Sequence, residues 1–403
     1  MMLMETILGY KRANGKTGFR NHVLVMSTVS CSNSVVQKIA QQTGSIPITH
    51  DQGCIEFEKD HQVTKLALIA AGQNPNVAGV LVVGLGCEQT SSSDLVGAIA
   101  GAGKLVECIC IQNEGGFPEA VEKGITIIRK MQEHTGRQER VEVSRGSLVV
   151  GVQCGGSDWT TALAGNSAIG AMSDAVIRNG GAVLMSEVDG LPGAEHIAAQ
   201  QAINHKVGIQ ILDMVTELKT NYMEQYGQRI EEVNPTPGNK AGGITTLIEK
   251  SIGTIKKMGS SPIQGVLKLG DAIPYPGLWI LDARLHGPDA FYLTAYAIEG
   301  ANITVFSTGR GTPIGSAVMP VIKVTGNPAA YKKLNSIIDF NAGVIIEGQS
   351  IEKVGESLYR YLLEVADGKL TKSEINGDFT YTIPREDDRK ITCSCRNHRS
   401  SRK

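Results

Sequence analysis

The 403-residue sequence lacks the features that mark several large classes of protein. No uninterrupted apolar stretch reaches 18 residues, so we predict no membrane-spanning helix. Lysine and arginine total 39 and aspartate and glutamate total 40, so no charge excess points to nucleic acid or to an anionic membrane. The start, MMLMETILGYKRANGK, has neither the apolar core nor the cleavage site of a signal peptide, and we expect a cytoplasmic protein.

Familiar motifs for nucleotide binding and acyl transfer are also missing. No GxGxxG follows an apolar run and no GxxxxGK[ST] occurs, so we predict no bound nucleotide. The GxSxG elbow of α/β-hydrolases does not occur either. The eight cysteines include no CxxC pair, which disfavours structural zinc, and in so long a chain they do not form a disulfide framework.

Glycine, by contrast, is abundant at 47 residues, and many glycines end an apolar run. This pattern is typical of an enzyme with many tight strand-to-helix turns. In the first part of the chain, short apolar runs alternate with segments of helical periodicity, which indicates a parallel sheet covered by helices. The predicted strands are 21–29, 45–50, 77–86 and 105–111, and the predicted helices are 33–42, 59–71, 94–102 and 118–133.

A second series of the same kind follows a polar, charged segment at 132–146, which we interpret as a boundary. It contains strands at 147–153 and 181–187, four further strands in GVLKL, GLWILDA, ITVFSTG and VIKVTG, and helices at 166–179, 194–218, 243–257 and 348–367. We therefore predict an α/β fold with Rossmann-like, mostly parallel sheets in two lobes, 1–143 and 144–384. The basic segment 385–403 is predicted to be a mobile tail.

Ligands bind beyond the carboxyl ends of the strands in a parallel sheet, and cysteines stand at several of these predicted ends. The cysteines in question are Cys31, Cys54, Cys87 and Cys154. A purely structural cysteine lies more often inside a strand, so we interpret Cys108 and Cys110, at alternate positions of one strand, as core residues.

Three of the strand-end thiols, Cys54, Cys87 and Cys154, are predicted metal ligands. Three thiolates can hold iron or an iron–sulfur cluster and leave one coordination position open for a substrate oxygen. The alternative is that small residues flanked by glycine stand at these ends only because tight turns need them.

Candidates for proton transfer follow the same strands. His50 follows the second predicted strand, and His196 lies in GAEH after the strand at 181–187; the sequence does not rank the two histidines. Glu88 adjoins Cys87 and is a general base, a group that orients a ligand, or only the first acidic residue of a helix.

Two loops offer groups for an anionic substrate. Asn239 and Lys240 lie near a helix start in NPTPGNKAGG, where a carboxylate is favoured, and Arg310 lies between glycines in STGRGTPIG. Asp158, in CGGSD after a strand, is a further candidate for substrate contact. An ordinary loop and a solvated arginine are the alternative interpretations.

Five motifs in order, GLGCE, CGGSD, GAEH, NPTPGNKAGG and STGRG, resemble the altronate/galactarate dehydratase family, which also includes the large subunit of sulfolactate sulfo-lyase. The resemblance runs from about Gly9 to about Asp378. It implies an iron-dependent lyase that removes water, or sulfite, from a hydroxy acid, and a homodimer of large subunits. Family members often have a small β-clip domain, fused or separate; because this chain starts directly at GYKRANGKTGFRNH, we expect a separate small β-clip subunit.

The sequence departs from the family at two places that bear on the substrate. The segment DARLHGPDAF (282–291) is longer than its sugar-acid counterpart, and the bulky Trp159 replaces a small residue. Both changes leave open whether the substrate is a sugar acid such as altronate or galactarate, or sulfolactate. A non-catalytic scaffold or regulatory subunit and a dehydrogenase are the remaining alternatives, disfavoured by the polar strand ends and by the missing dinucleotide motif.

Overall fold

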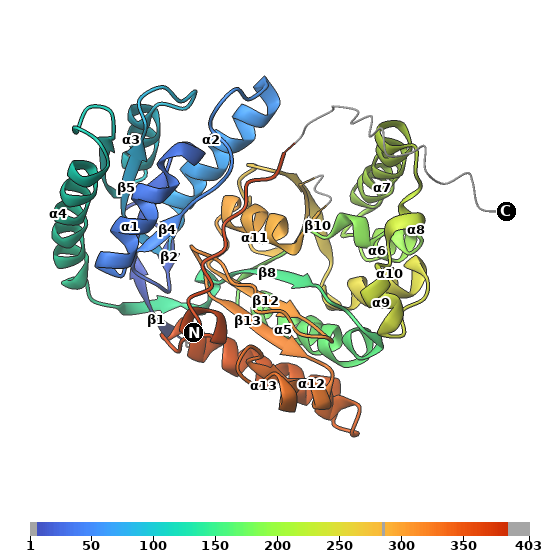
Figure 1. Ribbon diagram of the computed structural model, residues 1–403. Coiled ribbons are helices and arrows are strands. Elements are labelled where there is room, and N and C mark those ends of the chain that lie inside the picture. The colour runs from blue at the N-terminus through green and yellow to red at the C-terminus, as the bar shows by residue number, and fades with distance from the viewer. Residues whose placement is uncertain (1–5, 284–286, 386–403) are drawn as a thin grey trace.

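The computed structural model describes residues 6–283 and 287–385, which form two parallel sheets and one small antiparallel sheet (Figure 1). The first parallel sheet, in the order β4-β3-β5-β6, comprises β3 (His22–Ser27), β4 (Ile46–Ile48), β5 (Val77–Gly84) and β6 (Leu105–Cys110). Its helices are α1 (Asn33–Thr43), α2 (Glu58–Gln73), α3 (Ser92–Ala100) and α4 (Phe117–Gly136). Every residue of β5 is buried, because α1 and α4 cover one face and α2 and α3 the other.

The second parallel sheet has seven strands in the order β10-β11-β9-β8-β12-β13-β14. These are β8 (Val149–Cys154), β9 (Ala182–Met185), β10 (Ile263–Lys268), β11 (Gly277–Asp282), β12 (Ile303–Ser307), β13 (Val321–Thr325) and β14 (Phe340–Asn341). After β8 the chain forms β9 beside it, then the edge strand β10 and the intervening β11, and it then crosses to the other side of β8 with β12. The carboxyl ends of the strands beside such a reversal are the usual place for a ligand.

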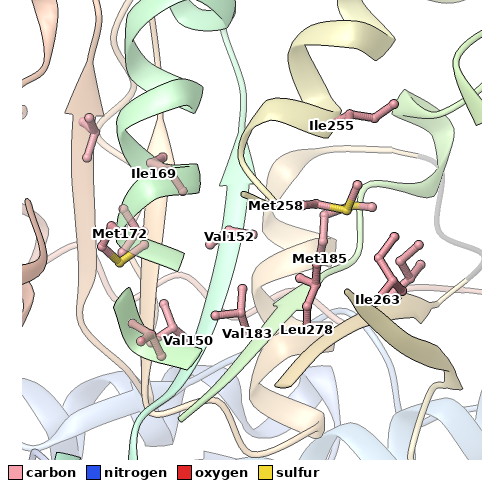
Figure 2. Close-up of a cluster of buried hydrophobic side chains, with 14 of the residues drawn as sticks. Val150, Val152, Ile169, Met172, Val183, Met185, Ile255, Met258, Ile263 and Leu278 are labelled. Carbon is pink, nitrogen blue, oxygen red and sulfur yellow. The ribbon is translucent and has the colours of Figure 1, made fainter. Parts of the chain in front are cut away.

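Helices cover both faces of the larger sheet. Figure 1 shows α5 (Asn166–Arg178) and α13 (Ile351–Ala366) along one face and α11 (Asp289–Ile298) on the other. The two-residue period of the strands sends Val150 and Val152 of β8 toward α5, where Ile169 and Met172 pack against them (Figure 2). The remaining helices are α6 (Glu195–Gln200), α7 (His205–Tyr226), α8 (Ile230–Val233), α9 (Pro237–Ala241), α10 (Leu247–Lys256), α12 (Pro328–Lys333) and α14 (Lys372–Ile375).

The two parallel sheets share one hydrophobic core. Side chains of α2 and α3 from the smaller sheet pack with those of α11 and the facing side of the larger sheet. Asn76 reinforces this junction, because its Nδ2 donates to the carbonyls of Asn302 (2.9 Å) and Val318 (3.0 Å). The division into lobes at 1–143 and 144–384 stays a prediction, but the sheets are packed against each other through a common interior.

The predicted parallel sheets with covering helices are confirmed, and the differences are local. The predicted helix at 194–218 is two helices, since the side chain of Asn204 caps α7 by accepting from the Val207 amide at 3.0 Å. The polar segment 132–146 contains β7 (Val141–Ser144), which pairs antiparallel with β1 (Thr6–Lys11); β1 also pairs with β2 (Thr17–Gly18). Of the predicted tail 385–403, all but Arg385 lies outside the described residues, as do Arg284 and His286.

The prediction that Cys108 is a core residue is wrong. Cys108 is exposed and Cys110 is half-buried. Both belong to β6, which is an edge strand of its sheet and is less covered than the central β5. Within the described part of the chain, no helix is long and apolar enough to cross a membrane.

A cavity of about 670 Å³ lies between the two sheets, and Glu299 is an acidic residue in its lining. Glu299 accepts from the Gly270 amide through Oε1 at 2.6 Å, while its buried Oε2 has no hydrogen-bond partner among the described residues. Burial, helped by the charge of Asp271, raises the pKa of Glu299 to about 7.

We predict that Glu299→Gln stabilises the protein above neutral pH. The folded state keeps this proton up to about pH 7, whereas the unfolded chain releases it near pH 4.5, so the contribution of Glu299 to stability falls as pH rises through that window. The substitution is expected to raise the free energy of unfolding by about 2 kcal/mol at pH 8 and to change it little at pH 4.5. Urea unfolding at both pH values measures this, with the exposed Glu122→Gln as control.

Candidate active site

A polar pocket of about 270 Å³ lies at the carboxyl ends of β8 and β9. Cys154 is the last residue of β8, and Glu187 follows β9 by two residues. The loop Gly155–Ser157 forms one wall, and Asp289 and Tyr292 of α11 form another. The pocket therefore stands where the parallel-sheet rule places a ligand site, beside the strand at which the order reverses.

Three ionisable side chains meet at the floor of this pocket. The thiol of Cys154 lies 3.1 Å from Glu187 Oε2 and 3.3 Å from Lys257 Nζ, and Lys257 also forms an ion pair with Glu187 Oε2. Lys257 has no exposed surface and Glu187 is 3% exposed. Buried charges of this kind are tolerated only when they are paired.

The charges of this floor cluster, Cys154–Glu187–Lys257, shift one another. Burial opposes the charge on Glu187, but Lys257 and then Lys250 outweigh it, and the pKa of Glu187 is lowered. Burial also opposes the charge on Lys257, but Cys154 and Glu187 outweigh it and raise its pKa. Burial, and next the charge of Glu187, raises the pKa of the Cys154 thiol. The cluster thus holds an ionised lysine–glutamate pair beside a protonated thiol.

A second lysine lies in the pocket wall. Lys250 Nζ is 3.7 Å from Glu187 Oε1 and donates to Asn234 Oδ1 at 2.9 Å. Burial opposes its charge, but Glu187 and Asp189 outweigh this and raise the pKa of Lys250, which therefore stays an ammonium. Lys250 lies on α10, and Lys257 caps the carboxyl end of that helix seven residues later. Seven residues are about two helical turns, so both ammonium groups lie on the same side of α10, toward Glu187.

Two further carboxyl groups line the pocket, and no lysine among the described residues forms an ion pair with either of them. Asp189 Oδ1 accepts from the Tyr292 hydroxyl at 2.7 Å, and burial, then the charge of Glu187, raises its pKa. Asp289 accepts a long hydrogen bond, 3.4 Å, from Gln153 Nε2. Burial, and next the charge of Glu187, raises the pKa of Asp289 to about 7.

Asp158 and Asn239, which we predicted to contact the substrate, form hydrogen bonds with the loops around the pocket instead. Asp158 Oδ1 accepts from the amides and hydroxyls of Thr160 and Thr161 at 2.6–3.2 Å, and its Oδ2 accepts from Asn327. Asn239 Oδ1 accepts from Thr236, and its Nδ2 donates to the Ser157 carbonyl at 3.0 Å. Asn239 nevertheless lines the pocket and ties α9 to its glycine loop.

The predicted cations lie outside the pocket lining. Arg310 is exposed; its Nη1 donates to the Gly238 carbonyl at 3.1 Å and its backbone amide donates to Gly156 at 3.0 Å. Lys240 is exposed on α9. Because Gly156 belongs to the pocket wall, both cations flank the loops that border it. His196 is exposed on α6 and does not line the pocket.

The remaining predicted residues lie at the carboxyl edge of the other sheet. His50 is buried: its Nδ1 accepts from the Gln52 amide at 3.1 Å, so Nε2 donates to the Ser27 carbonyl at 2.8 Å. Burial lowers its pKa, which keeps it neutral. Cys54 and Cys87 are exposed on loops joined by the Gln89 amide, which donates to the Gly53 carbonyl.

Glu88, on the same edge, is held by its own turn. Its Oε2 accepts from the amides of Gly86 (2.6 Å) and Cys87 (2.9 Å), and its Oε1 accepts from the Thr28 hydroxyl at 2.8 Å. Burial opposes its ionisation, but these backbone and side-chain donors outweigh burial and lower the pKa of Glu88.

Two family models match most of the chain. Residues 9–136 match the second domain of D-galactarate dehydratase/altronate hydrolase, and residues 145–387 match the C-terminal domain of D-galactarate/altronate dehydratase. The chain belongs to this dehydratase family. It is 36% identical to altronate dehydratase of Bacillus subtilis over 92% of this chain and 76% of that one, and 34% identical to altronate dehydratase of Escherichia coli over 91% and 75%. It is also 30% identical to (2R)-sulfolactate sulfo-lyase subunit beta of Chromohalobacter salexigens, over 94% of this chain and 97% of that subunit.

Family membership makes the chain a lyase, since dehydratases are lyases. The lysines that line or underlie this pocket were not predicted from the sequence. The available signal was the buried face of α10, where Lys250, Ser251 and Thr254 occupy helical positions that normally carry apolar residues.

Among the described residues, the three thiols predicted as metal ligands are not grouped in one metal site. Cys154 belongs to the floor cluster of the seven-stranded sheet, whereas Cys54 and Cys87 lie at the edge of the four-stranded sheet. Across residues 6–283 and 287–385, no group of three or more His, Cys, Asp or Glu is arranged to hold a metal ion. The need for iron stays a prediction.

We predict that Lys257→Met strongly destabilises the protein. The change leaves Glu187 buried beside a thiol and weakly paired, a loss expected to cost about 3–5 kcal/mol of unfolding free energy. Denaturant unfolding measures it. Lys256→Met, the exposed neighbour, is the matched control and is expected to cost under about 0.5 kcal/mol.

A double-mutant cycle isolates the pair. Lys257→Met combined with Glu187→Gln is expected to lower the free energy of unfolding by less than the sum of the two single changes. The double variant removes both charges of the pair, whereas each single variant leaves the other charge buried without its partner. Additive costs would contradict a direct interaction.

Proposed function

We propose that the chain is a hydro-lyase that dehydrates a sugar acid, such as altronate or galactarate, to a 2-keto-3-deoxy acid in the pocket at the ends of β8 and β9. The observation that carries the proposal is the arrangement of two ammonium groups and three carboxyl groups around one small pocket at a strand-order reversal. The names of the two altronate dehydratase relatives support the reaction class.

The reaction has two difficult parts that this pocket suits. A proton must leave the carbon next to a carboxylate, which builds negative charge on the carboxylate oxygens, and hydroxide must leave the next carbon. The ammonium of Lys250 lies in the pocket wall and would stabilise the developing charge more than the starting carboxylate. The exposed Arg310 and Lys240 beside the glycine loop would hold the far end of the substrate.

A sulfolactate sulfo-lyase is the second candidate, because the chain is also 30% identical to a sulfo-lyase subunit beta over 94% of its residues. In that case sulfite replaces hydroxide as the leaving group. Our proposal also includes cytoplasmic location, a homodimer of this chain and a separate small β-clip subunit; the word "subunit" in the name of the sulfo-lyase relative supports a partner chain.

Product analysis decides between the two reactions. The chain, purified anaerobically with the proteins that co-purify from its own source, is incubated separately with altronate, galactarate and (2R)-sulfolactate. We expect 2-keto-3-deoxy acid from one of the sugar acids and no sulfite. Sulfite without keto-deoxy acid would establish the second candidate, and neither product would reject both.

We predict that Lys250→Met lowers kcat/KM for the active substrate by about 100-fold or more, because it removes one preorganised charge from the pocket. Lys256→Met, on the same helix but exposed, is the control and is expected to keep full activity. Equal activity of the two variants would contradict the placement of the reaction in this pocket.

Iron dependence is tested by metal content. We predict that Cys87→Ser and Cys154→Ser do not lose iron in parallel, because these thiols lie at the edges of different sheets. Iron per chain after anaerobic purification is measured for both variants and for Cys54→Ser. Parallel loss in all three would restore the three-thiolate site, and full iron and full turnover in all three would remove these cysteines as ligands.

A further inference from the structure

We infer that Asp289 is the general acid of the reaction: it donates a proton to the hydroxide that leaves the substrate. The inference rests on the proposed function and adds to it the residue that activates the leaving group. It is drawn from the surroundings of Asp289 in the pocket, which differ from those of the two other carboxyl groups there.

The backbone holds Asp289 against the glycine loop of the pocket. Asp289 is the first residue of α11 and follows Pro288, and both residues line the pocket. Its carboxyl group lies so close to Gly155 that a Cβ on that residue would stand 2.1 Å from Oδ2. Glycine at 155 therefore leaves the space that the carboxyl group occupies.

Among the described residues, no lysine, arginine or histidine forms an ion pair with Asp289, and its hydrogen bond is the 3.4 Å contact from Gln153 Nε2. Glu187, by contrast, has Lys257 and Lys250, and Asp189 has the Tyr292 hydroxyl. A buried carboxyl group without a cation keeps its proton more readily than one that is paired.

The pocket thus separates its carboxyl groups into two kinds. Lysines hold Glu187 in its ionised form, whereas burial and the nearby charges of Glu187 and Asp189 favour the protonated form of Asp289, against the opposing charge of Lys250. Two carboxyl groups whose surroundings push their pKa values apart are the usual pattern of a base and an acid that act on one substrate.

The proton on the carbon next to the substrate carboxylate passes to ionised Glu187, and its electron pair forms the carbon–carbon double bond. The carbon–oxygen bond of the next carbon breaks, and the departing hydroxide takes the proton of Asp289 to leave as water. The enol product becomes the keto acid, and the proton on Glu187 returns to Asp289 through solvent, so both residues regain their starting forms.

The test compares two leaving groups. Hydroxide needs a proton to leave, whereas fluoride leaves without one, so a general acid matters for the first and not for the second. Wild type, Asp289→Asn and the exposed control Asp213→Asn are assayed on altronate and on its 3-deoxy-3-fluoro analogue, with 2-keto-3-deoxy acid as the product in both cases. If galactarate proves to be the active acid, its fluoro analogue is used instead.

We expect Asp289→Asn to lower kcat on the hydroxy acid by about 100-fold or more and to turn over the fluoro analogue within a few-fold of wild type. Turnover of the fluoro analogue also shows that the variant is folded. Asp289→Glu is expected to restore part of the activity on the hydroxy acid, with a loss of rate at high pH as in wild type.

Two results would overturn the inference. Full activity of Asp289→Asn on the hydroxy acid would exclude an essential acid, and equal loss on both substrates would assign Asp289 to structure or to proton removal. Failure of the proposed function is distinguishable: wild type itself would then form no keto-deoxy acid from any sugar acid, and this inference would fail with it.

Discussion

The arrangement of side chains at the carboxyl end of the seven-stranded sheet depends on Lys257, a lysine with no exposed surface. An ammonium taken out of water must be matched by negative charge, and Lys257 finds it on Glu187, next to the Cys154 thiol. That requirement fastens α10 to the ends of β8 and β9. Lys250, seven residues before this cap of α10, is thereby held in the pocket wall, so the position of one buried charge determines where another lines the pocket.

Most of the fold could be predicted because apolar runs and glycine turns mark strands wherever they occur. The pattern does not show which strand ends lie close together, because every strand of a parallel sheet is an apolar run that is buried on both faces. Cys54 and Cys87 follow strands and Cys154 ends one, close to the prediction, but the structure divides the three thiols between two sheets. The prediction of one shared thiol site assumes that all three strand ends lie at the edge of the same sheet. The described residues form two parallel sheets, each with its own carboxyl edge.

The site could be predicted only in part, for a related reason. Cys154, at the end of β8, was predicted as a site residue. Lys250 on α10 and Lys257 at its carboxyl cap were not, because the polar buried face of that helix was not recognised. Asp158 illustrates the opposite error, because a carboxylate that caps a turn through Thr160 and Thr161 has the same sequence context as one that binds substrate. Hydrogen bonds between residues nearby in the sequence decide the difference, and the pattern does not show them.

The burial of Cys154 has a consequence for the chemistry of thiols in this chain. A thiol reacts with alkylating and oxidising agents as its thiolate, and the raised pKa and enclosed position of Cys154 suppress that form. Among the cysteines that the structure describes, Cys31, Cys54, Cys87 and Cys108 are exposed and react with such reagents before Cys154. Within this set, oxidation would begin around the four-stranded sheet and would spare the thiol that lines the pocket.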